Sequence, residues 1–133
     1  MTAGVVCDAS ALVALLLDGG PEGRWVADHL SGARLLGPSL VLFETSNIIR
    51  RHELAGLVSA DQAAQAHLDL LDLAIEQWPY QLLASRAWEL RQNLSLYDAR
   101  YVALAELAST ELITLDARIA RAPNLRCTIR VPA

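Results

Sequence analysis

Short apolar runs alternate with longer helical segments along this chain, and that alternation limits the folds open to it. Five apolar runs are typical of strands, at residues 5–7, 34–36, 75–78, 112–115 and 127–131. Apolar spacing and Ser, Pro and Gly punctuation predict helices over residues 10–17, 40–55, 81–92, 96–108 and 117–122, with two more starting at Pro21 and after Ser59. Ser39 is the expected N-cap of the 40–55 helix. The expected class is α/β, a three-layer fold with a small, mostly parallel sheet flanked by helices.

Length and composition favour one soluble domain. The chain has 133 residues and 53% apolar residues, enough for a single core, and residues 1–133 are expected to form one domain. No apolar run approaches the roughly 20 residues of a membrane span, and we expect neither a span nor a signal peptide. Cys7 and Cys127 lie near opposite ends without metal-site spacing, and we interpret them as buried free thiols of a cytoplasmic protein.

The charged residues exclude several classes of protein. All eleven basic residues are arginines, and fifteen acids give a net charge of -4. A Walker P-loop, a receiver domain and a Schiff-base enzyme each need a lysine, so none of them can be built from this chain. The acidic balance also argues against a simple basic nucleic-acid binder.

Two aspartates directly follow predicted strands. Asp8 ends the first strand and Asp116 the fourth, and each precedes a helix. In open α/β sheets, ligands bind at the carboxyl ends of strands, where such residues meet. Either aspartate taken alone is more often a helix cap than a catalytic residue.

Two further acids lie on predicted helices. Glu44 is on a largely apolar stripe, so its carboxylate either pairs with Arg51 or faces a metal-bearing cleft. Asp98 comes three residues after Ser95, in the first turn of its helix, where a capping role alone would explain it.

Convergence of the four acids would require a counter-charge. Two carboxylates about 4 Å apart repel by roughly 4 kcal/mol at an effective dielectric near 20, whereas a domain is stable by only about 5 to 15 kcal/mol. Such a cluster must protonate in part or bind cations, and oxygen donors favour Mg²⁺ or Mn²⁺. A metal-activated water could then attack a phosphodiester.

The acidic net charge does not exclude RNA as a substrate. Without Asp8, Glu44, Asp98 and Asp116, the remaining acids equal the eleven arginines in number. Several arginines could contact phosphates, although each is also explained as part of a solvated helix face: Arg50, Arg51, Arg91, Arg100, Arg118 and Arg121. The three histidines are interpreted as surface or packing residues, and Trp25, Trp78 and Trp88 as core anchors.

Four segments in order resemble the PIN-domain ribonucleases, and in detail the VapC toxins of bacterial toxin–antitoxin modules. They are residues 6–12 (VCDASAL), 43–47 (FETSN), 96–106 (LYDARYVALAE) and 112–118 (LITLDAR). The first segment alone is weak, but all four in this order and at these distances cover nearly the whole chain.

The resemblance implies an Mg²⁺- or Mn²⁺-dependent endoribonuclease toxin that cleaves structured RNA, either tRNA or ribosomal RNA. It assigns Asp8 and Asp98 as direct metal ligands, and Glu44 and Asp116 as acids that act through water or orient the nucleophile. Ser10, Asn47 and Thr114 are the supporting residues, and Arg50, Arg51, Arg100 and Arg118 are candidate contacts to RNA or antitoxin. It also implies a homodimer and inhibition by a VapB antitoxin.

Two alternatives remain open. One is a PIN-like binding or regulatory module without catalysis, for which retention of four mutually repelling acids has no use. The other is a phosphatase with an aspartyl nucleophile at Asp8, a chemistry that usually needs a second acid two residues later, where this chain has Ser10.

Overall fold

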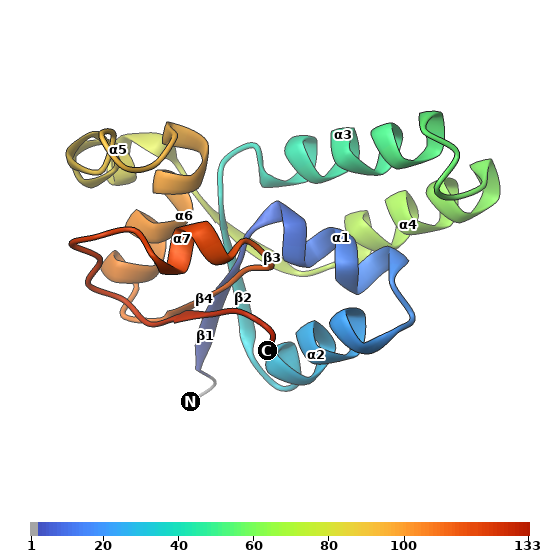
Figure 1. Cartoon of the computed structure of the whole chain (residues 1–133), viewed down its shortest axis with the longest axis horizontal. Coiled ribbons are helices and arrows are strands. Elements are labelled where there is room, and N and C mark those ends of the chain that lie inside the picture. Colours follow the sequence, from blue (N-terminus) through green and yellow to red (C-terminus); the bar gives the residue numbers. More distant parts are fainter. Residues whose placement is uncertain (1–2) are drawn as a thin grey trace.

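The alternation of strands and helices is present in the computed structural model, which describes residues 3–133. The strands in this range are β1 (Gly4–Cys7), β2 (Arg34–Pro38), β3 (Ile75–Trp78), β4 (Glu111–Ile113) and β5 (Ile129–Arg130). The helices are α1 (Ala9–Leu17), α2 (Pro21–Leu30), α3 (Val41–Leu54), α4 (Ala60–Asp72), α5 (Tyr80–Glu89), α6 (Leu96–Leu107) and α7 (Ala117–Ala120). The predicted α/β class is confirmed (Figure 1).

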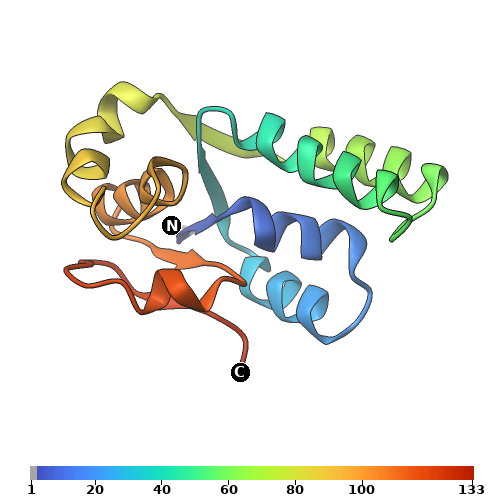
Figure 2. The same cartoon turned by 45° about the horizontal axis from the view of Figure 1, so that its top comes forward.

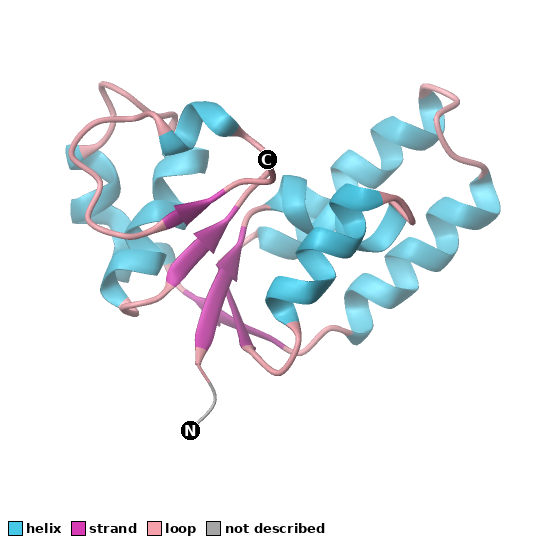
Figure 3. Cartoon of the chain, turned by 60° about the horizontal axis from the view of Figure 1, so that its bottom comes forward, coloured by secondary structure: helices cyan, strands magenta, loops and turns pink. Residues whose placement is uncertain are grey.

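The five strands form one parallel sheet in the order β3-β2-β1-β4-β5. The first strand, β1, lies in the middle of the sheet. Strands β2 and β3 follow on one side of it, and β4 and β5 lie on the other side. The strand order therefore reverses between β1 and β4, and the central arrowheads point to the same edge (Figure 3). At such a reversal the loops after the two strands diverge and leave a crevice at the carboxyl edge.

Helices cover both faces of the sheet, which gives the predicted three layers. Helices α1 to α4 pack together on one side, and α5, α6 and α7 lie on the other (Figures 1 and 2). Helix α6 contacts β1, β2 and β4, and every residue from Ala99 to Ala105 is buried. A helix that is apolar all round belongs in the interior, and this one carries the third acid on its first turn.

Side-chain caps define where four of the helices begin. The Asp8, Ser59, Ser95 and Asp116 side chains each accept a backbone N–H from the first turn of the helix that follows. Ser59 and Gln62 form the complete capping box expected from the sequence. Asp8 and Asp116 are therefore caps as well as candidate site residues, so the two interpretations of each are compatible.

The predicted N-cap of α3 is wrong. Leu40 occupies that position with a φ of 75°, and no side chain caps the helix. The Ser39 N–H and hydroxyl both donate to the Trp78 carbonyl, at 2.8 and 3.1 Å, so Ser39 fastens the β2–α3 turn to the end of β3. A leucine in the left-handed region is strained, and these contacts hold it there.

Other corrections concern single residues and element ends. Trp88 is not a core anchor, because its side chain is 56% exposed on α5. Helix α5 ends at Glu89 rather than at residue 92, and β4 ends at Ile113 rather than at residue 115. The expected buried thiol holds for Cys7, whereas Cys127 is half-buried.

Among residues 3–133, no helix has the length and apolar character that crossing a membrane requires.

Candidate active site

Asp8 is held by three donors at the carboxyl end of β1. Its Oδ1 accepts from the Ser10 hydroxyl at 2.6 Å and from the Ala11 N–H at 3.0 Å, and its Oδ2 accepts from the Thr114 hydroxyl. The residue is 5% exposed. Burial raises the pKa of this carboxyl, the three hydrogen bonds oppose the rise, and the charge of Asp98 adds to it. Asp8 is thus a buried carboxylate in a fixed orientation.

The loop after β4 is hydrogen-bonded to the first turn of α1. The Asp116 N–H donates to the Thr114 hydroxyl oxygen at 3.0 Å, and the Leu115 N–H donates to the Ser10 hydroxyl oxygen at 3.2 Å. Ser10 and Thr114 therefore support Asp8 and align the chain that carries Asp116. The hydrogen bonds to a carboxylate expected of both hydroxyls are present.

The Asp116 carboxylate faces an arginine of its own short helix. Arg118 Nε donates to Asp116 Oδ1 at 3.1 Å and its terminal nitrogen donates to Oδ2 at 2.9 Å. This guanidinium holds the pKa of Asp116 below its usual value. The Arg118 side chain is 81% exposed, so the contact is a surface pair that other cations can replace at low cost.

Asp98 lies half-buried on the first turn of α6, where its N–H donates to the Ser95 hydroxyl at 3.2 Å. Burial raises the pKa of the Asp98 carboxyl, and the negative charges of Asp116 and Glu44 raise it further. These effects agree with the hydrogen bonds, which link Asp8 and Asp116 through Thr114 and link Glu44 to Arg100 and Tyr101 on the helix of Asp98.

Glu44, on the first turn of α3, pairs with a residue that the sequence did not indicate. Its Oε1 accepts from the Arg100 guanidinium and from the Tyr101 hydroxyl, the latter at 3.1 Å. The predicted pairing with Arg51 is wrong, because Arg51 is exposed on the last turns of α3. The other predicted interpretation, a carboxylate that faces a metal-bearing cleft, stays a prediction, and the charge of Glu44 raises the pKa of Asp98.

The donor set fits a divalent cation, although its side chains are not arranged around one. Across residues 3–133, no three Asp, Glu, His or Cys side chains are already grouped closely enough to hold a metal ion. Asp116 and Glu44 are turned toward Arg118 and Arg100, which offset two of the four negative charges. The donors are carboxylate oxygens, the ligands that Mg²⁺ and Mn²⁺ prefer.

The other predicted site residues differ in how exposed they are. Asn47, Arg50 and Arg51 are exposed on α3. Arg100 is not on a solvated face as expected: it is 7% exposed, and its guanidinium donates to the Ser39 carbonyl at 2.6 Å as well as to Glu44. One signal could have placed it inside, because α6 is apolar on all sides around position 100.

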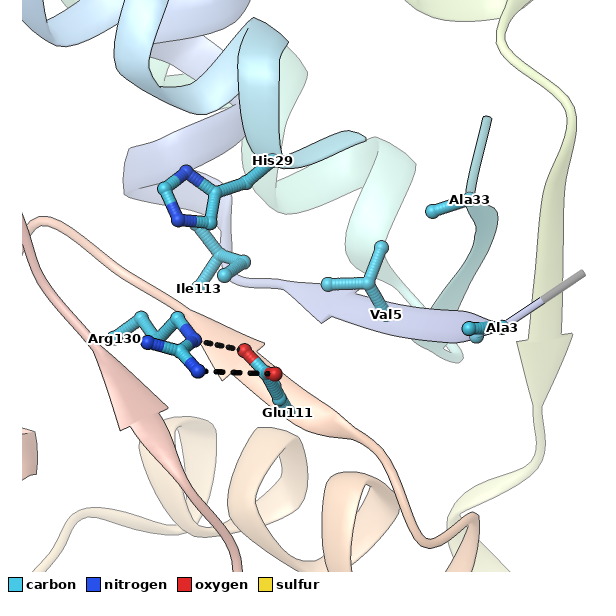
Figure 4. A pocket seen from close by; sticks show the side chains of 8 residues that line it. Ala3, Val5, His29, Ala33, Glu111, Ile113 and Arg130 are labelled. Atoms are coloured by element: carbon cyan, nitrogen blue, oxygen red, sulfur yellow. Dashed lines mark hydrogen bonds and ion pairs between the residues drawn. The ribbon is translucent and has the colours of Figure 1, made fainter. Parts of the chain in front are cut away.

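Two of the hollows formed by residues 3–133 can be compared with the position of the acids. One of about 480 Å³ separates α1 from the end of α3 and begins at Ser10 and Leu115, beside the acidic cluster. A second, of about 380 Å³, lies against the first residues of β1 and β4, at the other end of those strands (Figure 4). There Glu111 and Arg130 pair with each other beneath His29, so that hollow is not part of the acidic site.

Comparison with known proteins identifies the family of this chain. The sequence profile of the PIN domain matches residues 5–125. Ribonuclease VapC9 of Mycobacterium tuberculosis is 37% identical over 127 residues, which cover 96% of this chain and 97% of the relative. Ribonuclease VapC12 of the same organism is 33% identical over 129 residues, 97% of this chain and 99% of the relative.

Solved structures show the same fold. VapC20 of Mycobacterium tuberculosis, described as a Sarcin-Ricin loop cleaving toxin, has a TM-score of 0.67 at 17% identity and covers 91% of this chain and 96% of its own. VapBC2 from Rickettsia felis, bound to a DNA fragment from its promoter, has a TM-score of 0.65 at 16% identity, over 95% of this chain and 98% of its own. This chain belongs to the PIN-domain family and, within it, to the VapC ribonucleases.

Proposed function

We propose that this chain is a divalent-metal-dependent endoribonuclease that acts as the toxin of a toxin–antitoxin pair. The observation that carries the proposal is the buried Asp8 carboxylate, fixed by Ser10, Ala11 and Thr114 within repulsive range of Asp98. Fixed, mutually repelling carboxylates at the switch point of a parallel sheet serve a bound cation and are costly without one.

The residues of this site have different proposed roles. Asp8 and Asp98 are the proposed metal ligands, and Mg²⁺ or Mn²⁺ bound there would supply an activated water and a counter-charge for the phosphodiester. When the Asp116 carboxylate separates from Arg118, it adds a further negative charge beside the bound ion. Glu44 orients water, and Ser10 and Thr114 keep Asp8 in place.

A structured RNA, tRNA or ribosomal RNA, is the proposed substrate. The similarity to VapC20, which is described as cleaving the Sarcin-Ricin loop, supports this class. Arg50, Arg51 and Arg118 are exposed, so their guanidinium groups can contact phosphates. The net charge of -4 equals the charge of the four site acids, so the rest of the chain does not repel RNA through an excess of acids. Asn47, exposed one helical turn after Glu44, is a further proposed support at this edge.

A VapB-type antitoxin is the proposed partner, bound in the hollow between α1 and α3. That hollow is lined mainly by apolar side chains, has Asp18 and Glu22 among its polar residues, and begins beside the site, so a basic, partly apolar segment fits it. We also propose a homodimer in the cytoplasm, supported by the exposed Leu40, Phe43 and Tyr97 and by free rather than bridged cysteines.

RNA cleavage with and without divalent metal tests the proposed activity. The wild type is expected to cut structured RNA with Mg²⁺ or Mn²⁺ and to stop when EDTA is added. Asp98→Asn should keep its circular dichroism spectrum and lose cleavage, whereas Asp72→Asn, an exposed acid on α4, should remain active. Cleavage by the wild type in EDTA, or by Asp98→Asn, contradicts the proposal. A folded wild type without divalent-dependent cleavage indicates a non-catalytic module.

Binding of an antitoxin segment is tested separately from cleavage. Leu57→Arg places a positive charge at the exposed rim of the hollow, where Leu57 is 70% exposed. This variant should cleave RNA like the wild type and escape inhibition by the cognate antitoxin. Unchanged inhibition would place the antitoxin elsewhere.

A further inference from the structure

Arg100 is the most buried arginine contact of the acidic site. Its side chain is 8% exposed and that of Glu44 is 18% exposed, so the pair is largely shielded from water. One guanidinium nitrogen donates to the Ser39 carbonyl at 2.6 Å and another donates to Glu44 Oε1. A planar fork with two fixed partners has far less freedom than a surface arginine.

Two aromatic rings restrict the same guanidinium. The Arg100 guanidinium carbon lies 5.5 Å from the Tyr97 ring centre and 5.2 Å from that of Tyr101. Both distances are within the range of cation–π attraction. The Tyr101 hydroxyl also donates to Glu44 Oε1, so two adjacent residues of α6 hold the same oxygen.

The carbonyl on the other side of Arg100 is fixed as well. Ser39 donates its N–H and its hydroxyl to Trp78, and the next residue, Leu40, has the strained φ of 75°. Arg100 therefore connects the helix of Asp98 to the β2–α3 turn from which Glu44 follows. Arg100 thus bonds both the turn before Glu44 and Glu44 itself, while Tyr101 adds a second bond from the same helix to the same carboxylate.

The two oxygens of Glu44 are not equivalent. The Arg100 guanidinium and the Tyr101 hydroxyl both donate to Oε1. Within residues 3–133, no donor contacts Oε2. An oxygen shared by a guanidinium and a phenol is a poor metal ligand, because the cation would have to displace both and would stand beside a buried positive charge. Oε2 is left to accept from water.

We propose that Arg100 is the positioning residue for Glu44, and that it holds Glu44 as an acceptor of water at the metal site instead of a direct ligand. This inference rests on the proposed function and assigns Glu44 its part in it. The direct ligands then remain Asp8 and Asp98, and a divalent ion held by one or two carboxylates keeps waters that Glu44 can accept from.

Four proteins test the inference: the wild type, Arg100→Gln, Glu44→Gln and the double variant. Each is checked by circular dichroism at the assay temperature, and kcat for RNA cleavage and the Kd for Mn²⁺ are measured, the latter by calorimetry without RNA. Arg100→Gln should lower kcat about 10- to 100-fold, the usual effect of removing a partner that orients a metal-site residue. The same change should tighten Mn²⁺ binding, by at least about threefold, because it removes a positive charge and frees a carboxylate.

The double variant separates positioning from simple packing. If Arg100 acts through Glu44, adding Arg100→Gln to Glu44→Gln lowers kcat no further. It should also tighten Mn²⁺ binding by a smaller factor than it does in the wild type, because only the loss of the positive charge remains. Multiplying losses in kcat, or weaker or unchanged Mn²⁺ binding in Arg100→Gln, would overturn the inference. Arg34→Gln is the matched control, since it breaks an exposed pair with Glu76 between β2 and β3 and should change neither quantity.

Two milder variants apply if Arg100→Gln does not fold. Tyr101→Phe removes one of the two bonds to Oε1 and should move kcat and Kd in the same directions by smaller factors. Arg100→Lys keeps the charge without the fork and should recover only part of kcat. No shift in either variant counts against the inference. If the wild type binds Mn²⁺ and Arg100→Gln changes the Kd as expected, but no RNA is cut, only the proposed activity is refuted. If the wild type binds no Mn²⁺, both the activity and the inference are refuted.

Discussion

Thr114 donates its hydroxyl to Asp8 although 106 residues separate them in the chain. The same hydroxyl oxygen accepts the Asp116 N–H, so one side chain joins the acids at the ends of β1 and β4. These strands are neighbours where the strand order reverses. The pairing that builds the centre of the sheet therefore also builds the acidic site.

Removing either hydroxyl should destabilise the protein. Thr114→Val leaves Oδ2 of the buried Asp8 carboxylate without a donor, which costs about 1 to 3 kcal/mol. Ser10→Ala removes one of the two donors to Oδ1 and leaves the Ala11 N–H, so it should cost less, about 0.5 to 1.5 kcal/mol. The free energy of unfolding in urea measures the effect. Thr128→Val, at an exposed position, is the control. A Thr114→Val protein as stable as Thr128→Val would show that the contact contributes nothing.

The metal-free protein should lose stability relative to Asp98→Asn as the pH rises. The pKa of Asp98 is raised above 3.8 in the folded state, so the folded protein holds this proton more tightly than the unfolded chain. The resulting stabilisation is complete below the unfolded pKa and is lost as the pH passes the folded pKa. Calorimetry in EDTA should show the difference in Tm between wild type and Asp98→Asn falling across that window. Parallel curves would contradict the raised pKa.

Arg118 should compete with metal for Asp116. Arg118→Gln removes a guanidinium that occupies both carboxylate oxygens, and should tighten Mn²⁺ binding at low salt by up to about fivefold, the range of an exposed ion pair. High salt should reduce the difference. If Arg118 also contacts RNA, KM rises in the same variant. Weaker Mn²⁺ binding would mean that Arg118 assists the metal site instead.

The two acids that pair with Arg86 should differ in importance. Glu106 has a 7% exposed side chain, accepts from Arg86 at 2.6 Å and also accepts the Arg126 N–H, whereas the Glu89 side chain is 58% exposed. Glu106→Gln should cost about 3 to 5 kcal/mol of unfolding free energy, and Glu89→Gln about 0 to 1 kcal/mol. Equal losses in urea unfolding would show that burial does not decide the strength of this network.

The sequence was most informative where local pattern and topology agree. Asp8 directly follows β1 and Asp116 comes three residues after β4, and acids placed just after buried parallel strands lie at the carboxyl edge of the sheet. Asp98 was found through its motif, and the structure adds that its helix is buried on all sides. These inferences needed no knowledge of which elements are neighbours.

Contacts between elements that are far apart in the chain could not be predicted from the sequence. Arg51 is on the helix of Glu44, so helical spacing favoured it as a partner, while Arg100 comes from a helix 56 residues away. An arginine is expected at the surface, and Arg100 is buried here against two rings of its own helix, with a carbonyl and a carboxylate from the β2–α3 turn and α3 as partners. The left-handed Leu40 that places the Ser39 carbonyl has no signature in the sequence.

Diffraction from crystals grown with Mn²⁺ tests the central claim most directly, because the anomalous signal locates the ion without reference to activity. The expected result is one anomalous peak with an oxygen of Asp8 and an oxygen of Asp98 within about 2.5 Å, and Asp116 released from Arg118. A peak away from these carboxylates, or none at saturating Mn²⁺, would contradict a metal centre built from the four acids.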